Sequence, residues 1–298
     1  LVNTIKQINE DEFLVLANFN RTKELEKIEK EAKKDENKEK LYDDSKDYLV
    51  ATEIPFWGNN VGFTNENRSR LYLFNKKTSE FIPLSNDITD NYCLQLNEDK
   101  TKAVFIANSY VGKMPLVTEV RVLDIKTKAV EVLAKDYSFE YVNFIDSRNI
   151  ITIATDMKEY GLNENSNIYI INTESKSFEK IVNDNFDMCM HNSVGTDIRL
   201  TGGKSILVKN GFMYFINTEV NSAYLYKIDK EGNLERLNEK SGSIDCFDVS
   251  KDGKIYAVAL KDSNLQDIYE ISMEEENRIS FHNDTTEYSL SEIEEISF

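Results

Sequence analysis

The chain has 298 residues, with 53 acidic and 36 basic side chains, so its formal net charge is −17. This length is enough for one large domain or two ordinary ones, and a hydrophobic content of 40% excludes wholesale disorder. No apolar run is long enough to span a membrane, and the acidic balance argues against a nucleic-acid partner, because phosphates would be repelled.

The start of the chain and its cysteines bear on the cellular compartment. The sequence opens at Leu1 without a charged-then-apolar leader, so we expect no signal peptide and a piece of a longer protein. Cys93, Cys189 and Cys246 lie far apart and lack the spacing of metal ligands. They are typical of reduced thiols, and we expect a cytoplasmic protein.

Short runs rich in β-forming residues, bounded by Asn, Asp, Lys and Gly, predict an all-β fold. One unit recurs, in which an apolar strand leads through a polar turn into a second strand. The turns open at Asn75, Asp124, Asn172, Asp229 and Ser272, at steps of 49, 48, 57 and 43 residues. We expect the Asn or Asp side chain to hydrogen-bond the backbone of its turn, which Thr, Ser or Gly closes.

A second hairpin precedes each copy of this unit. Its turns are at 9–11, 97–99, 146–148, 209–211 and 250–253. Two hairpins in about 50 residues give four antiparallel strands per repeat, which is typical of a β-propeller blade. We count about five blades, whose fourth strands end near Phe81, Val130, Phe178, Leu234 and Ile279. A large β-sandwich is the alternative, but a sandwich has no reason to repeat the same double hairpin.

The first blade is interrupted between Asn18 and Ser69. Within the interruption, residues 21–47 carry nineteen charges, nine basic and ten acidic, with a thin apolar stripe at helical spacing. This pattern predicts one charged helical insertion, whose ordinary role is a solvated surface. Residues 53–63 (EIPFWGNNVGF) follow and gather aromatic residues and glycines in a loop. Such a loop can line a binding site or plug a junction between blades.

The residues that catalysis would need are missing. No Gly-x-Ser-x-Gly pentapeptide is present, and the two histidines, His191 and His282, lie 91 residues apart. The run Cys-Met-His at 189–191 is too short for a zinc site, and paired carboxylates are too common in an acidic chain to indicate acid/base chemistry. We therefore expect no catalytic triad, no metal site and no cofactor in this chain.

The residues at 53–57 (EIPFW), 62–63 (GF) and 68–72 (RSRLY) resemble the propeller of the prolyl-oligopeptidase family of serine peptidases, in its acylaminoacyl-peptidase-like branch. In that branch a charged helical insertion precedes a similar Pro-Phe-Trp segment. Residues 288–298 look like the start of the linker to the family's α/β-hydrolase domain. The resemblance spans residues 1–298 and rests most on residues 53–72.

The resemblance implies a propeller of about seven or eight blades that caps a hydrolase domain carrying Ser, Asp and His. Such a propeller gates access, so that short or unfolded peptides reach the serine, and it is not catalytic alone. Peptide substrates and the chain's own C-terminal hydrolase domain are the implied partners. Phe56 and Trp57 are the candidates for an apolar subsite. Arg68 and Arg70 are candidates for a substrate carboxylate or an acid on the other domain, with Arg70 equally an ordinary surface residue.

Two other interpretations stay open: a free-standing propeller that binds a protein or peptide on its rim, and a periplasmic or surface propeller of the TolB-like kind. Fewer blades are counted here than the family has. The first and last blades would then each expose an apolar face, which predicts either closure with distorted blade angles or self-association through these faces.

Overall fold

The computed structural model describes residues 1–24, 27, 48–194, 203–262, 264–272, 275–283, 294 and 296. Residues 21–24 form a helical turn directly after the second strand, but the rest of the predicted insertion at 21–47 lies outside the described residues, except for residue 27. The predicted linker at 288–298 also lies outside them, except for residues 294 and 296.

The first sheet contains four antiparallel strands. They run in the order β1 (Val2–Gln7), β2 (Glu12–Asn20), β5 (Asn67–Asn75) and β6 (Glu80–Pro83). β2 and β5 pair along their whole length, from Glu12 opposite Asn75 to Asn20 opposite Asn67. β2 and β5 are therefore neighbours in the sheet although residues 21–66 separate them in the sequence.

The second sheet joins two four-stranded units through one long strand. Its strands are β7 (Thr89–Leu96), β8 (Lys102–Ser109), β9 (Thr118–Asp124), β10 (Val130–Phe144), β11 (Asn149–Thr155), β12 (Asn167–Asn172) and β13 (Phe178–Lys180). The first half of β10 pairs with β9 and the second half pairs with β11. β10 is thus the fourth strand of one unit and the first strand of the next.

The third sheet also holds two such units. Its strands are β14 (Ile206–Lys209), β15 (Phe212–Glu219), β16 (Ser222–Asp229), β17 (Leu234–Arg236), β18 (Ser243–Val249), β19 (Ile255–Leu260), β20 (Asp267–Ile271) and β21 (Glu276–Arg278). A single parallel pair, Ala223 with Ser243, joins the two units. Across the described residues, the strands of the three sheets form five antiparallel groups of four. The all-β class and the four-stranded unit predicted from the repeat are confirmed.

The repeated turn is built as predicted. Four of the turn-opening side chains accept backbone N–H groups two to four residues further on, at 2.8 to 3.2 Å: Asn75, Asp124, Asn172 and Asp229. In the fifth turn, the hydroxyl of Ser272 accepts the N–H of Glu275 at 3.0 Å. These bonds satisfy backbone donors at each turn without a partner from elsewhere in the chain.

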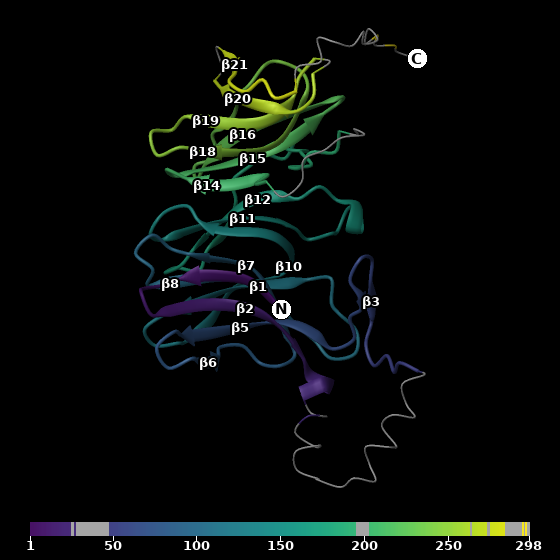
Figure 1. Ribbon diagram of the computed structural model, residues 1–298, viewed down its shortest axis with the longest axis vertical. Helices are drawn as coiled ribbons and strands as arrows, with labels where there is room; N and C mark the ends of the chain where they lie inside the picture. The colour runs from purple at the N-terminus through teal and green to yellow at the C-terminus, as the bar shows by residue number, and fades with distance from the viewer. Residues whose placement is uncertain are drawn as a thin grey trace.

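Apolar side chains fill the space between successive units. Between the first two units, for example, Leu14, Leu71 and Phe105 belong to one buried cluster. Similar clusters join each later unit to the next. Burying a Leu or Phe side chain contributes roughly 1.5–3 kcal/mol, so these clusters supply most of the stability. Figure 1 shows the units following one another along the long axis, from purple and blue strands low in the view to yellow strands at the top.

The other face of the first sheet carries what we call the outer aromatic face: Phe13, Tyr72, Phe74 and Phe81. The Phe74 and Phe81 rings stack with centroids 4.5 Å apart, and Tyr72 meets Phe81 edge-on at 6.1 Å. Phe13, Tyr72 and Phe74 alternate along β2 and β5 with buried leucines, so they point away from the second unit, and Phe81 on β6 stands opposite Phe74. Phe81 exposes 52% of its surface.

Candidate functional site

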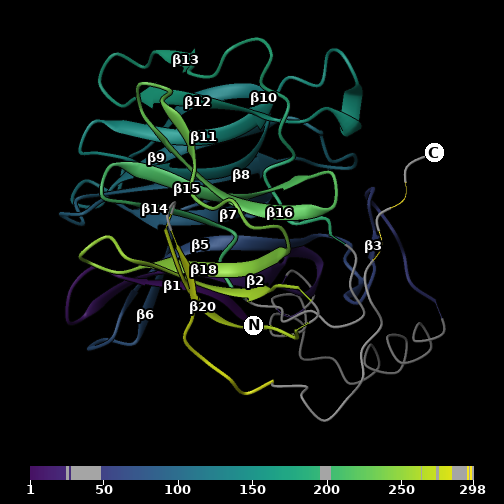
Figure 2. The same cartoon turned by 90° about the horizontal axis from the view of Figure 1, so that it is seen from above.

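One edge of the sheets carries the long loops. Residues 48–66 are the part of the connection between the second and third strands of the first unit that leads into β5, and the segments at 110–117 and 156–166 join the second strand of a unit to its third. The first of them forms a small hairpin, β3 (Trp57–Gly58) with β4 (Gly62–Phe63), and the third holds the 3-10 turn η1 (Gly161–Asn163). Figures 1 and 2 both place β3 beside the sheets on the right, apart from the strands.

The first two loops are joined by backbone hydrogen bonds. The N–H of Ile54 donates to the carbonyl of Gly112 at 2.7 Å, and the N–H of Met114 donates to the carbonyl of Ile54 at 2.9 Å. Ile54 and Lys113 thereby form a parallel bridge. The loop of the second unit thus supports the hairpin that projects from the first.

Large apolar side chains gather on these two loops, and we call this set the apolar face. It comprises Ile54, Phe56, Trp57, Val61, Val111 and Leu116, all exposed. Trp57 exposes 61% of its surface and Phe56 exposes 45%. The Phe56 ring also lies near the Phe63 ring, with centroids 6.4 Å apart. Single exposed apolar residues are ordinary, whereas six on two hydrogen-bonded loops make this region a candidate for an interaction site.

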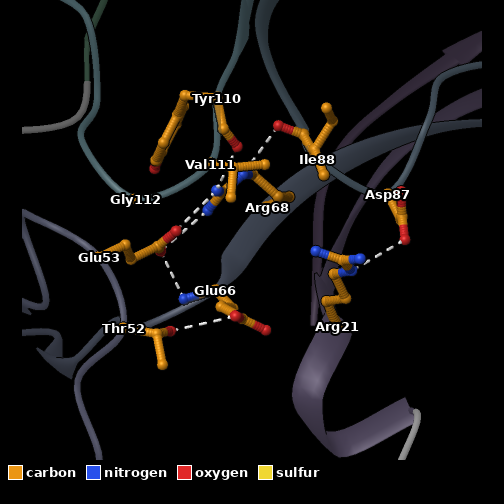
Figure 3. Close-up of a pocket in the computed structure, with 10 residues that line it drawn as sticks. All are labelled: Arg21, Thr52, Glu53, Glu66, Arg68, Asp87, Ile88, Tyr110, Val111 and Gly112. Carbon is orange, nitrogen blue, oxygen red and sulfur yellow. Dashed lines mark hydrogen bonds and ion pairs between the residues drawn. The ribbon is translucent and has the colours of Figure 1, made fainter.

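A buried ion pair lies next to the apolar face, and Figure 3 shows the Glu53 and Arg68 side chains pointing toward each other. Glu53 binds the Arg68 guanidinium with both oxygens: Nη1 to Oε1 is 3.0 Å and Nη2 to Oε2 is 2.8 Å. Each side chain is only 3% exposed. Two parallel charge-assisted hydrogen bonds of this kind fix the relative orientation of the groups they join.

The remaining donors of Arg68 bind backbone carbonyls. Nε donates to Ile88 at 3.1 Å, Nη1 to Asn67 at 2.8 Å and Nη2 to Tyr110 at 3.2 Å. The guanidinium also stacks on the Tyr110 ring, with Cζ 3.7 Å from its centroid. Because a guanidinium has five N–H donors, all of them are engaged inside the protein.

The surroundings of Arg68 set its charge state. Burial alone would lower the pKa of Arg68, but the hydrogen bonds and the charge of Glu53 outweigh burial and raise it. Burial raises the pKa of nearby Asp90, although the backbone N–H of Ser69, 2.6 Å from its carboxylate, and the charge of Arg68 oppose this shift. The charge of Glu53 raises the pKa of Asp90 further.

Further bonds tie the two ends of the hairpin segment together. The Glu53 carboxylate also accepts the N–H of Glu66, and the Asn65 side chain accepts the N–H groups of Thr52 at 2.8 Å and Glu53 at 3.2 Å. The cavity beside the ion pair measures about 60 Å³. A ligand pocket needs roughly 300 Å³ or more, so this arrangement is an anchor for the loops.

The four residues singled out from the sequence therefore do not form one site. Phe56 and Trp57 both belong to the apolar face, and both side chains are exposed. Arg68 is paired with Glu53, which a substrate carboxylate would have to displace in order to reach the guanidinium. Arg70 lies on the sheet: its Nε donates to the Ser85 carbonyl at 2.8 Å, and its Cζ is 4.9 Å from the Phe19 ring centroid.

Sequence reasoning missed Glu53 and Tyr110 as partners of Arg68. No periodic pattern links a loop glutamate to an arginine fifteen residues later, or either of them to an aromatic residue in the next unit. Within the described part of the chain, no group of three or more His, Cys, Asp or Glu side chains is placed to hold a metal ion. No helix among the described residues has the length and apolar character that crossing a bilayer requires.

No protein-family model and no curated protein matches the chain. Solved structures do match. Pyrococcus horikoshii acylaminoacyl peptidase matches 94% of this chain with a TM-score of 0.61 at 16% identity. The match to a puromycin hydrolase covers 72% of this chain and 34% of that protein's length, with a TM-score of 0.52 at 13% identity. An oligogalacturonate lyase in complex with manganese matches 74% with a TM-score of 0.50 at 14% identity, over 61% of its length.

At such low identities these likenesses show the fold. It is a β-propeller region similar to those of acylaminoacyl peptidase and puromycin hydrolase. The chain spans only 38% of the length of that acylaminoacyl peptidase. The likeness is consistent with the resemblance that residues 53–72 carry.

Proposed function

We propose that this chain is the propeller region of an acylaminoacyl-peptidase-like serine peptidase, and that it gates peptide access to a separate α/β-hydrolase domain. It has no hydrolytic activity alone. The observation that carries the proposal is the apolar face, which two bonded loops present at one edge of a propeller fold. The hydrolase domain packs on this face, and Phe56 and Trp57 contact it or the peptide that passes between the two domains.

The anchor next to the apolar face suits it for docking. Ordering a flexible loop on binding costs free energy, and the Glu53–Arg68 pair has already fixed the base of the hairpin. Trp and other aromatic residues at the centre of interfaces carry much of the binding energy. A prearranged Trp57 therefore gives a docking contact at low entropic cost.

Gating follows from the geometry of such an assembly. A propeller that covers the active site excludes folded proteins by size, whereas short peptides pass. Selectivity of this kind needs no stronger contact with the correct substrate, because it acts by excluding the wrong one. The three cysteines are free thiols, which supports a cytoplasmic location.

The test compares this chain with the full-length gene product on acylated amino-acid and short-peptide chromogenic substrates. We expect hydrolysis by the longer protein alone. In that protein, Trp57→Ala should loosen the contact between domains and increase cleavage of a folded protein substrate that the gate otherwise excludes by size. Phe81→Ala is the matched control, because Phe81 is also exposed but lies on the outer aromatic face. Inactivity of both proteins would show that the peptidase assignment is wrong. Equal effects of the two variants would show that the apolar face is not the surface on which the hydrolase domain packs.

A free-standing propeller that binds a protein or peptide is the alternative function. The outer aromatic face supports it, because exposed stacked rings are also suited to a partner. The sequence of the encoding gene distinguishes the two functions. If it continues past Phe298 into a Gly-x-Ser-x-Gly motif, the free-standing propeller is excluded.

A further inference from the structure

A cavity of about 890 Å³ lies at the opposite edge of the sheets from the apolar face. Strands β1, β7, β10 and β14, the first strands of four units, contribute to its lining. The turns at 97–99, 146–147 and 210–211, which join first to second strands, form its rim. The apolar face is built on loops that join second to third strands, at the other end of the second strand. The two features are therefore separate.

Lys6 is the notable cation in this cavity. Its Nζ donates to the side-chain oxygen of Gln95 at 2.9 Å. Among the described residues, no carboxylate lies within ion-pair distance of it. Burial lowers the pKa of Lys6, Cys93 opposes that shift, and the charge of Lys204 lowers the pKa further. A half-buried ammonium is expected to have a counter-charge, so this one is suited to receive an anion.

The other lysines of the lining already have partners. Lys204 Nζ lies 2.9 Å from the Asp248 carboxylate. Lys209 Nζ donates to the backbone carbonyl of Val249. Lys6 is therefore the lining cation that a ligand can engage without displacing a carboxylate or a carbonyl.

Acidic residues lie at the rim. Asp99 binds the backbone N–H and the hydroxyl of Thr101, at 3.0 and 2.6 Å. Asp146 pairs with Lys230 at 2.9 Å. Glu98, beside them, faces the same cavity. A ligand with an anionic end and a cationic end matches this distribution of charge better than a simple anion does, because its cationic end can lie at the acidic rim.

The rest of the lining mixes amide groups with apolar ones. Asn97 and Asn143 bring side-chain amides that are held by hydrogen bonds within the protein, and Leu96, Phe144 and Val208 offer apolar contact. The volume falls within the roughly 300–1,000 Å³ typical of ligand pockets. Amide groups spaced by side chains of mixed polarity are the chemistry of a short peptide.

We propose that this cavity binds a short peptide by its free terminal carboxylate, with Lys6 Nζ as the receiving cation and the acidic rim facing the peptide's ammonium group. The biological source of the peptide rests on the proposed function. The binding itself is a property of this chain and needs neither the apolar face nor a hydrolase domain.

The experiment is calorimetric titration of this chain with the tripeptide Ala-Phe-Ala and with its C-terminal amide. We expect the free acid to bind about tenfold more tightly or better, because a hydrogen bond between charged groups is lost in the amide. Lys6→Gln should abolish this preference, and Lys6→Arg should retain it. Lys76→Gln is the matched control, since Lys76 is an exposed lysine in the β5–β6 turn. Thermal melting of each variant establishes that it is folded.

Three results would overturn the proposal: equal binding of acid and amide, no binding of either, or an unchanged preference in folded Lys6→Gln. Sodium acetate and sodium phosphate are titrated in parallel. If either binds as tightly as the peptide in a Lys6-dependent manner, the site takes a simple anion and the peptide assignment is wrong. If the Trp57 test fails but peptide binding depends on Lys6, the docking function is rejected and the cavity site is kept. If the Trp57 test succeeds but peptide binding does not depend on Lys6, the cavity site is rejected and the docking function is kept.

Discussion

The two edges of the sheets are built differently. At one edge the chain turns within a few residues, and in four units an Asn or Asp at the equivalent position accepts backbone N–H groups of the turn. At the other edge the loops differ in length, and two of them are joined into the apolar face. The first edge depends on local hydrogen bonds, whereas the second depends on a buried ion pair between residues 53 and 68.

This difference shows how the fold separates stability from recognition. Local turns repeat because each satisfies its own backbone, so none depends on a neighbouring unit. A projecting loop needs a contact to hold it, and here Arg68 supplies that contact from the start of β5, next to the apolar face. Rigid support for exposed residues is the usual arrangement of binding loops.

Breaking the ion pair should have the largest effect. Arg68→Met leaves the Glu53 carboxylate buried without a partner, so we expect a loss of about 3–5 kcal/mol in the free energy of unfolding, measured by urea titration. Proteolysis within residues 54–63 should become faster as well. The control is Lys77→Met, which removes an exposed pair with Asp11 and should cost less than about 1 kcal/mol.

The double variant Glu53→Leu with Arg68→Met sharpens this prediction. Replacing a buried ion pair by apolar side chains is often nearly neutral, so most of the lost stability should return. A single Arg68→Met variant that unfolds no more easily than Lys77→Met would contradict the role of Arg68 as an anchor.

Self-association through the outer aromatic face comes next in size. We expect this chain to self-associate at high concentration, and Phe81→Lys to weaken the association about tenfold or more, because it places a charge in an apolar contact. Analytical ultracentrifugation measures both effects. Trp57→Lys serves as the control, because Trp57 is exposed on the apolar face instead. A clean monomer at every concentration would show that this face needs no second copy.

The sequence was informative where the structure is local. The turn residues Asn172 and Asp229 could be assigned from their neighbours alone, and so could the strand pairing that follows from them. Two members of the apolar face, Phe56 and Trp57, could be recognised in the sequence. The anchor was not, because burial of Arg68 depends on Tyr110 in the next unit, and no pattern within the chain records that contact.

Removing one local turn should have a moderate effect. Asn172→Ala removes the acceptor for the N–H groups of Glu174 and Ser175, which lie 3.0 and 2.9 Å from its side-chain oxygen. We expect a loss of about 1 kcal/mol in the urea titration. Asn172→Asp keeps the acceptor and loses only the donor bond to the Asn149 side-chain oxygen at 3.1 Å, so it should cost less than Asn172→Ala. Equal losses in the two variants would show that the side-chain oxygen is not what stabilises the turn.

The exposed side chains of the hairpin should contribute little to folding. Trp57→Ala is expected to change the free energy of unfolding by no more than about 0.5 kcal/mol, because the side chain is mostly exposed. Phe105→Ala, which empties a position that is 1% exposed, should cost about 3–5 kcal/mol in the same assay. A large loss from Trp57→Ala would mean that the residue supports the fold and would weaken its assignment to docking.

The smallest effect concerns pH near the anchor. Because burial raises the pKa of Asp90 in the folded protein, its contribution to stability is present below the ordinary value of 3.8 and is lost as pH rises through the raised folded value. Asp90→Asn should therefore flatten the fall in stability just above pH 3.8, because Asn does not titrate and still offers an acceptor to the Ser69 N–H. Urea midpoints of the wild type and Asp90→Asn, measured across this range, give the difference that isolates Asp90. If the wild type instead gained stability relative to the variant as pH rose, the charge of Arg68 would outweigh the effect of burial on Asp90. Arg68 would then stabilise a second carboxylate, although all its hydrogen-bond donors are engaged.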